Sequence, residues 1–218
     1  MLPQLLLWAA VHAAGLPFQR AVELEAPQLE PAAGACVSFR GGSGFVVSPQ
    51  GHVITAHHVS EMVGETPWVR VGWTDSPGPP PVRLTLVAVD RNADLALYRL
   101  PPGSYEHVPL RAVPAERGER IHAMAHPPHR PLFYSQGDVL EAPTLWAGQP
   151  ILEYTAPAYD GYSGGAVLDS EGRAVGVHRG WDYRDIGHGQ LVAVPAAEVR
   201  KLLDQQAEQE GLDAAATP

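Results

Sequence analysis

A serine flanked by glycines stands in the segment Asp160-GYSGGAV, with Ser163 at its centre. A nucleophilic serine needs a tight bend where backbone N–H groups converge on the oxygen that becomes an oxyanion, and glycine permits such a bend. Gly161, Gly164 and Gly165 give the chain that freedom on both sides of the serine. The same pattern also fits a flexible turn, so Ser163 becomes a candidate nucleophile only if a base and an orienting acid accompany it.

Two adjacent histidines end the segment Gly42-SGFVVSPQGHVITAHHV, whose pattern predicts a strand, a turn and a second strand. Histidine is the side chain best suited to take a proton from a serine at neutral pH. We expect His57 and His58 to lie on extended backbone and therefore to point to opposite faces. Only one of them can then meet the serine, and the segment by itself leaves both open.

An aspartate opens the alternating apolar strand of Asn92-ADLALYRL. Asp94 is placed where a carboxylate would be buried beside the core, and a buried carboxylate needs a partner such as an imidazole N–H. The alternative is an aspartate that caps a turn of its own backbone. Asp90 lies in the turn VDRNAD and is better suited to that capping role.

The elements that must position these residues are mostly strands. Short runs rich in Val, Ile, Leu and aromatic residues follow one another from Cys36, at a spacing of roughly 8–12 residues, separated by turn sequences. Glycine and proline number 22 each, which favours strands joined by tight turns over a helical bundle. The segment that follows Pro195 predicts a helix over about 196–210, because Val199, Leu202 and Leu203 fall on one face. The sequence therefore predicts an all-β fold with a C-terminal α-helix.

The remaining segments carry weaker patterns. Residues 14–35 are expected to be irregular, residues 212–218 a disordered tail, and the proline-rich run from Asp75 a surface loop. Residues 1–13 have the apolar centre and small-residue ending of a signal peptide, although they lack the usual positive charge before the apolar run. Cleavage would place the protein outside the cytoplasm, secreted or periplasmic; otherwise it is cytoplasmic. The segment is too short for a stable membrane span.

Composition excludes several classes of partner and cofactor. The formal net charge is −9 and no basic run interrupts it, which argues against nucleic acid as a partner. The single cysteine, Cys36, allows neither an intramolecular disulfide nor a thiolate-rich zinc site, and its apolar neighbours predict a buried structural role. His122, His126 and His129 lie close in sequence, but no acidic or cysteine ligand is interleaved, so we expect no metal site and no cofactor.

The order His, Asp, Ser is that of the trypsin-like serine peptidases and differs from that of subtilisins and α/β-hydrolases. The stretch 36–205 resembles bacterial members of that family, namely HtrA-type proteases and glutamyl endopeptidases. GSGFVVSPQGHVITAHHV is similar to their histidine block, in which the histidine directly before Val is catalytic, and this selects His58. ADLALYRL is similar to their aspartate block and selects Asp94, and GYSGGAVLDSEGRAVGVH resembles their serine block around Ser163.

The resemblance implies a fold and a reaction. The fold is two six-stranded antiparallel β-barrels of the chymotrypsin type within residues 36–211, with a boundary near 101–118. The reaction is hydrolysis of peptide bonds in a protein or peptide substrate through an acyl-enzyme, with backbone N–H groups of Gly161 and Ser163 binding the oxyanion. The alternative is a catalytically silent module that binds peptides or a partner through the same groove. Oligomeric state is left open.

Specificity follows from the same resemblance. His178 in AVGVHRGW corresponds to the histidine with which glutamyl endopeptidases bind an acidic P1 side chain, and Arg179 would add positive charge. The Thr or Ser five residues before the serine in those enzymes is Ala158 here, and the Asp that a trypsin-like pocket requires is Pro157. We therefore expect an acidic or small P1 residue rather than Lys or Arg.

The residue before the serine departs from the animal enzymes of the family. Those enzymes have an Asp that pairs with a new N-terminal amine when the zymogen is cleaved, whereas this chain has Tyr162. That route of activation is closed. The site must therefore be preformed or ordered by another contact.

Overall fold

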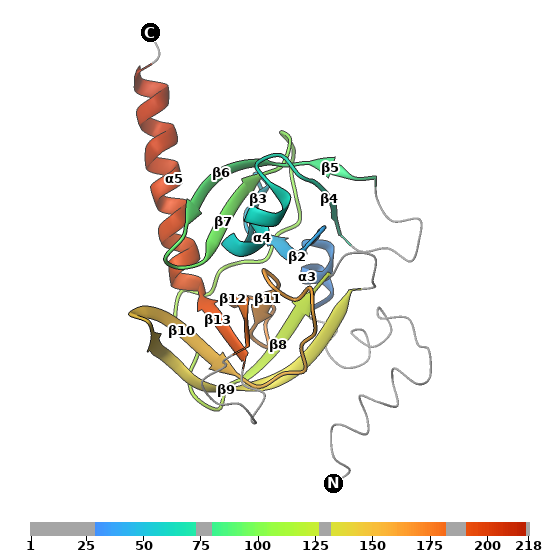
Figure 1. Ribbon diagram of the computed structural model, residues 1–218, viewed down its shortest axis with the longest axis vertical. Helices are drawn as coiled ribbons and strands as arrows, with labels where there is room; N and C mark the ends of the chain where they lie inside the picture. Colours follow the sequence, from blue (N-terminus) through green and yellow to red (C-terminus); the bar gives the residue numbers. More distant parts are fainter. Residues whose placement is uncertain (1–28, 73–79, 127–131, 182–190, 217–218) are drawn as a thin grey trace.

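The computed structural model describes residues 29–72, 80–126, 132–181 and 191–216 (Figure 1). The predictions for residues 1–13, for 14–28 and for most of the proline-rich loop lie outside the described residues. Within the expected irregular segment, the structure has a short helix, α3 (Glu30–Gly34), which a proline in its first turn favours. Leu29, directly before it, is fully buried and anchors this helix on the core.

The described residues of the N-terminal half form one antiparallel sheet of seven strands, in the order β5-β4-β1-β2-β3-β7-β6. The strands are β1 (Cys36–Phe39), β2 (Gly42–Val46), β3 (His52–Ala56), β4 (Trp68–Val71), β5 (Val82–Arg83), β6 (Thr85–Asp90) and β7 (Leu95–Arg99). This N-terminal sheet is a half-barrel, whereas we expected a closed barrel of six strands. β3 pairs with β7 along its whole length, so the residues that follow β3 and precede β7 lie at the same end of the sheet.

The described part of the C-terminal half is a closed antiparallel barrel of six strands, in the order β10-β13-β12-β11-β8-β9. The strands are β8 (Arg120–Ala125), β9 (Phe133–Trp146), β10 (Gln149–Tyr154), β11 (Ala166–Leu168), β12 (Ala174–Trp181) and β13 (Leu191–Pro195). This C-terminal barrel matches the prediction. The all-β class and the chymotrypsin-like arrangement of two β units are confirmed.

Two helices complete the fold. α4 (His57–Val63) follows β3 directly, and α5 (Ala196–Ala216) follows β13. The predicted C-terminal helix is confirmed, but it continues beyond 210 to Ala216, so the expectation of a disordered tail from 212 is wrong up to that residue. α5 packs on β6 and β7 of the N-terminal sheet as well as on β12 and β13, and its last turns extend past the sheet (Figure 1).

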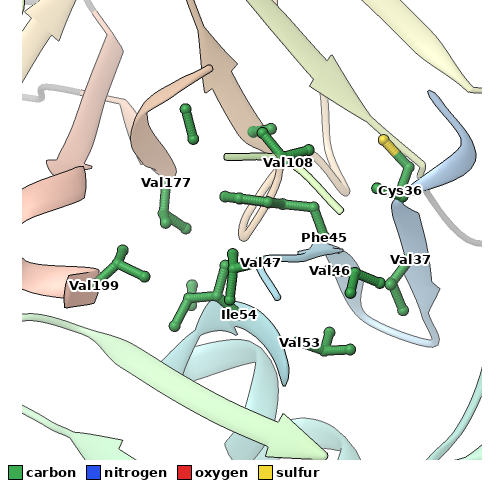
Figure 2. Packing of buried hydrophobic residues seen from close by; sticks show 14 of the residues in the cluster. Cys36, Val37, Phe45, Val46, Val47, Val53, Ile54, Val108, Val177 and Val199 are labelled. Carbon is green, nitrogen blue, oxygen red and sulfur yellow. The ribbon is translucent and has the colours of Figure 1, made fainter. Parts of the chain in front are cut away.

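Of the two hydrophobic core clusters among the described residues, the larger runs through both halves and the other fills the C-terminal barrel. Figure 2 shows Phe45 and Ile54 of the N-terminal sheet together with Val177 of β12 and Val199 of α5. Burying a side chain of this size contributes about 1.5–3 kcal/mol, so contacts that cross between the halves hold them in a fixed relation. Cys36 lies in the same core, and burial raises the pKa of its thiol to about 12. The prediction of a buried structural cysteine is confirmed.

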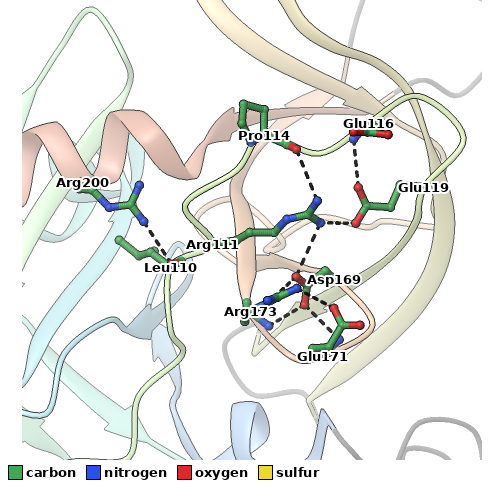
Figure 3. Close-up of polar contacts among 9 residues, drawn as sticks. All are labelled: Leu110, Arg111, Pro114, Glu116, Glu119, Asp169, Glu171, Arg173 and Arg200. Atoms are coloured by element: carbon green, nitrogen blue, oxygen red, sulfur yellow. Dashed lines mark hydrogen bonds and ion pairs between the residues drawn. The ribbon is translucent and has the colours of Figure 1, made fainter.

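A cluster of charged residues ties the segment between the halves to the C-terminal barrel (Figure 3). The fully buried carboxylate of Asp169 accepts the backbone N–H of Glu171 and both the backbone N–H and Nε of Arg173. Arg111, in the connecting segment, lies 3.6 Å from the same carboxylate. Arg200 of α5 donates to the carbonyl of Leu110 at 3.1 Å, so the helix holds this segment as well.

Candidate active site

The end of β3 carries His58 into the first turn of α4. The extended backbone that we expected at the two histidines is wrong, because the chain turns into a helix after Ala56. The separation of the two side chains still holds. His57 is buried, with its Nε2 4.0 Å from Glu61, whereas the side chain of His58 is 41% exposed and faces Asp94.

Asp94 stands directly before β7 and binds His58 through both carboxylate oxygens. His58 Nδ1 lies 2.9 Å from Oδ2 and 3.2 Å from Oδ1, and the backbone N–H of His58 donates to Oδ1 at 3.0 Å. The backbone N–H of His57 donates to the Asp94 carbonyl at 3.0 Å. Asp94 has a φ of +58°, a left-handed conformation that aspartate tolerates better than most residues. The site residues predicted as base and orienting acid are therefore brought together.

Asp90 takes the capping role that the sequence suggested. Its Oδ1 accepts the backbone N–H groups of Asn92 at 2.9 Å and of Ala93 at 3.0 Å. These bonds close the turn between β6 and β7. Asp94 follows this turn, directly before β7.

The loop that carries Ser163 is held from both halves of the molecule. The backbone N–H of Ser43 in β2 donates to the carbonyl of Ser163 at 2.8 Å, and the Ser43 hydroxyl donates to the carbonyl of Gly161 at 2.7 Å. Thr55 fixes Ser43 in turn by donating its hydroxyl to the Ser43 carbonyl at 2.6 Å. From the other side, Gly164 N–H donates to the carbonyl of His178 at 2.8 Å. Sequence reasoning missed Ser43 and Thr55, although both lie within the histidine block.

The backbone of this loop leaves two donors unused. The N–H groups of Tyr162, Gly164 and Gly165 all donate to backbone carbonyls. Within the described ranges, the N–H groups of Gly161 and Ser163 have no protein acceptor. Gly161 has a φ of +94°, a conformation that glycine adopts without strain. Two free donors on either side of Tyr162 are the pattern that an oxyanion-binding loop requires.

His178 is enclosed by aromatic side chains. Its Nδ1 lies 2.5 Å from the hydroxyl of Tyr154, and the rings of Tyr154 and Tyr162 meet it edge-on. Burial, with a smaller contribution from the charge of His58, lowers the pKa of His178 to about 3, so the imidazole is neutral. Burial also raises the pKa of Tyr154 well above 10, so its hydroxyl keeps its proton and can donate to Nδ1. His178 then carries its own proton on Nε2.

Residues 42–177 match the family model of the trypsin-like peptidase domain. This match covers more than half of the chain and includes His58, Asp94 and Ser163. The chain belongs to the trypsin-like peptidase family. Its serine type follows from the family, as the order of the three blocks predicted.

The sequences of two curated relatives match part of this trypsin-like peptidase. It is 31% identical over 151 residues to the uncharacterized protein y4bJ of Sinorhizobium fredii, and the match takes in 67% of the peptidase and 22% of the relative. It is 26% identical over 176 residues to the chloroplastic protease Do-like 1 of Arabidopsis thaliana, with 75% of the peptidase and 38% of the relative matched. The chain thus spans well under half the length of either relative.

Solved structures of proteases have the same fold as this peptidase. The active form of the Rv3671c protease of M. tuberculosis superimposes with a TM-score of 0.68 at 24% identity, covering 84% of the peptidase and 85% of that chain. A serine endoprotease from Yersinia pestis gives a TM-score of 0.69 at 22% identity, covering 82% and 65%. At these identities the likeness establishes the fold.

The structure places the other predicted specificity residues of the peptidase as follows. Ala158 is buried, and Tyr162 is buried against the rings of Phe133 and Tyr159. Arg179 contacts Asp94, with its Nε 3.3 Å from Asp94 Oδ2. Arg179, which we expected to add positive charge for a substrate carboxylate, therefore contacts the carboxylate of Asp94.

Two of the three histidines of the IHAMAHPPHRP segment, His122 and His126, lie in the described part of the chain. His122 bonds to the hydroxyl of Tyr134 at 2.8 Å, and burial lowers the pKa of His126 to about 4. His129 lies outside the described residues. Among the residues that the structure describes, no group of three potential ligands could hold a metal ion, and no helix is long and apolar enough to cross a membrane.

Proposed function

We propose that the chain is an active serine endopeptidase in which Ser163 is the nucleophile, His58 the general base and Asp94 the orienting acid. The observation that carries this proposal is the contact of Asp94 with both the backbone N–H and the ring Nδ1 of His58. It fixes the ring with its other nitrogen available to a serine hydroxyl. The same contact stabilises the imidazolium that forms when the ring takes the proton.

The reaction divides into two transfers. Ser163 Oγ attacks the carbonyl carbon of the scissile bond while its proton moves to His58 Nε2, and the N–H groups of Gly161 and Ser163 bind the oxyanion. His58 then gives the proton to the leaving amine, which leaves an ester on Ser163. Water, deprotonated by the same histidine, hydrolyses the ester and restores the hydroxyl. One oxyanion donor typically contributes about 3 kcal/mol to lowering the barrier.

Covalent labelling by a fluorophosphonate probe tests this proposal. We expect the native protein to be labelled, with the adduct on the peptide that contains Ser163. Ser163→Ala and heat-denatured protein should remain unlabelled. Well-folded protein that does not react would overturn the proposal and favour the silent peptide-binding module.

We further propose that the enzyme cleaves proteins or peptides after small or acidic residues. Ala158 offers no hydroxyl to a carboxylate, His178 is neutral, and Arg179 is engaged by Asp94. An acidic P1 side chain would therefore gain a hydrogen bond from His178 Nε2 but no ion pair, so these contacts support small P1 residues better. Digestion of a mixed peptide library, read by mass spectrometry, tests the preference, and frequent cleavage after Lys or Arg would contradict it.

A further inference from the structure

The Asp94 carboxylate contacts nitrogen-bearing side chains from both halves of the molecule. His58 approaches from α4, and Arg179 approaches from β12 with its Nε 3.3 Å from the oxygen that also contacts His58 Nδ1. The side chain of Asp94 is 12% exposed and that of Arg179 is 27% exposed. Shielding of this degree weakens solvent screening, so the guanidinium interacts with the carboxylate more strongly than in a surface ion pair.

A break in the strand pairing aims Arg179 at this carboxylate. In β12 and β13, His178 pairs with Ala193 and Gly180 pairs with Val192, so Arg179 is an additional residue with no partner across the ladder. A β-bulge of this kind redirects one side chain. His178 can therefore point into the aromatic cluster of the barrel while Arg179 reaches the N-terminal sheet.

A tryptophan fixes the guanidinium from its other side. The Arg179 Cζ lies 4.7 Å from the centre of the Trp146 ring, within the range of a cation–π contact. Trp146 ends β9 at the hairpin to β10, where Ala147 and Gly148 both have a positive φ. The stacked, planar guanidinium is held with one edge toward Asp94. A lysine at this position could supply the charge but not the fork or the stack.

We propose that Arg179 is a positioning residue that keeps the Asp94 carboxylate directed at His58, and that its charge opposes a second positive charge at the same carboxylate. This inference rests on the proposed function. A proton taken up by the His58 ring would place two positive charges on one carboxylate, and these charges would repel each other.

The other groups around His58 do not supply this effect. His178 of β12 is close enough to interact with His58 but is neutral. On α4 itself, the His57 ring lies 4.0 Å from the carboxylate of Glu61. Within the described residues, the fixed positive charge in contact with Asp94 is therefore that of Arg179.

The pH profile of fluorophosphonate labelling tests the proposal. For Arg179→Gln we expect the acidic limb of the labelling rate to move to higher pH by about 0.5–1 unit, which lowers the rate at pH 6 by about three- to tenfold. For Arg179→Lys we expect the acidic limb to lie at the same pH as in the wild type. Its labelling rate at the plateau of the pH profile should be lower. Arg117→Gln removes an exposed arginine paired with Glu141, away from the site, and should change neither.

An NMR titration of the His58 ring reads the charge effect without catalysis. We expect its midpoint to rise by about 0.5–1 pH unit in Arg179→Gln relative to the wild type. Equal midpoints and coincident labelling profiles in wild type and Arg179→Gln would overturn the inference and leave the proposed function standing. A wild type that is never labelled would overturn the proposed function, while the titration would still decide the charge effect.

Discussion

The backbone N–H of Ser43 donates to the carbonyl of Ser163 across 2.8 Å, so a strand of the N-terminal sheet directly holds the loop of the candidate nucleophile. The same residue binds Gly161 through its hydroxyl, and its own carbonyl accepts the hydroxyl of Thr55. The residues around His58 and those around Ser163 therefore share one hydrogen-bonded frame. Formation of the candidate site requires the two halves to be correctly docked.

Gly164→Ala should distinguish the effect of disrupting this hydrogen-bonded frame from the effect of backbone strain alone. A Cβ at Gly164 would lie 2.1 Å from the Ser43 carbonyl oxygen and 2.2 Å from Thr55 Oγ1, and φ is +86°. We expect labelling by the fluorophosphonate to fall by at least a hundredfold. Gly118→Ala is the matched control, since φ is +81° and nothing lies within 4 Å of its added Cβ. It should lose only about 1–2 kcal/mol of stability and keep its labelling rate; equal labelling rates in the two variants would contradict this prediction.

The two neighbouring aspartates should give opposite phenotypes. Asp94→Asn retains a residue type that tolerates the left-handed backbone but removes the charge that orients His58, so labelling should slow by at least about a hundredfold. Asp90→Ala removes two hydrogen bonds of the turn and should destabilise the fold by about 1 kcal/mol. Its labelling rate should stay within about threefold of the wild type. Urea unfolding and labelling on the same samples measure both effects.

Buried His178 should make stability fall in acid. Its folded-state pKa is lowered to about 3 against about 6.5 in the unfolded chain, so below pH 6.5 the unfolded state binds a proton that the folded state does not. The stabilisation is therefore present above about pH 6.5 and is lost as the pH falls toward 3, at up to about 1.4 kcal/mol per unit.

Urea unfolding at pH 8 and pH 4.5 measures this loss. In His178→Gln the loss of unfolding free energy between the two pH values should shrink by about 3 kcal/mol. His107→Gln, at an exposed position, should leave it unchanged. An unaltered pH dependence in His178→Gln would show that the imidazole is protonated in the folded state.

Among the charged residues outside the candidate site, we expect Asp169 to contribute most to the stability of the fold. Asp169→Asn replaces a buried acceptor of four N–H contacts from Glu171, Arg173 and Arg111 with a side chain that can accept fewer of them, and we expect a loss of about 3–5 kcal/mol. Glu171→Gln changes an exposed partner of Arg173 and should lose less than about 1 kcal/mol. Thermal unfolding of both variants gives the comparison, and equal melting temperatures would contradict it.

Local sequence was sufficient where local chemistry decides the structure. The turn role of Asp90 follows from its neighbours, and the strand runs and the helix from Ala196 follow from hydrophobic periodicity. The selection of His58 and Asp94 came from the resemblance of their blocks, and the structure brings these two residues into contact. The sequence did not predict the turn into α4, because the N-cap residue Ala56 has no side chain that could cap a helix.

Contacts that depend on register between distant strands could not be predicted. Arg179 looked like a substrate-binding charge because its position beside His178 was known but the bulge that turns it toward Asp94 was not. Its stack on Trp146 depends on where the β9–β10 hairpin ends. The open N-terminal sheet likewise depends on how far β4 and β5 extend the pairing beyond β1, which no local pattern reveals.

The strand order of the C-terminal barrel also has a consequence for synthesis of the chain on the ribosome. β13 lies between β10 and β12, so the barrel cannot close until residues 191–195 have been made. His58 and Asp94 emerge much earlier, yet the strand that carries Arg179 and supports the Ser163 loop lacks its neighbour until then. A nascent chain that ends before β13 would therefore contain all the proposed catalytic residues without the closed barrel that supports the Ser163 loop.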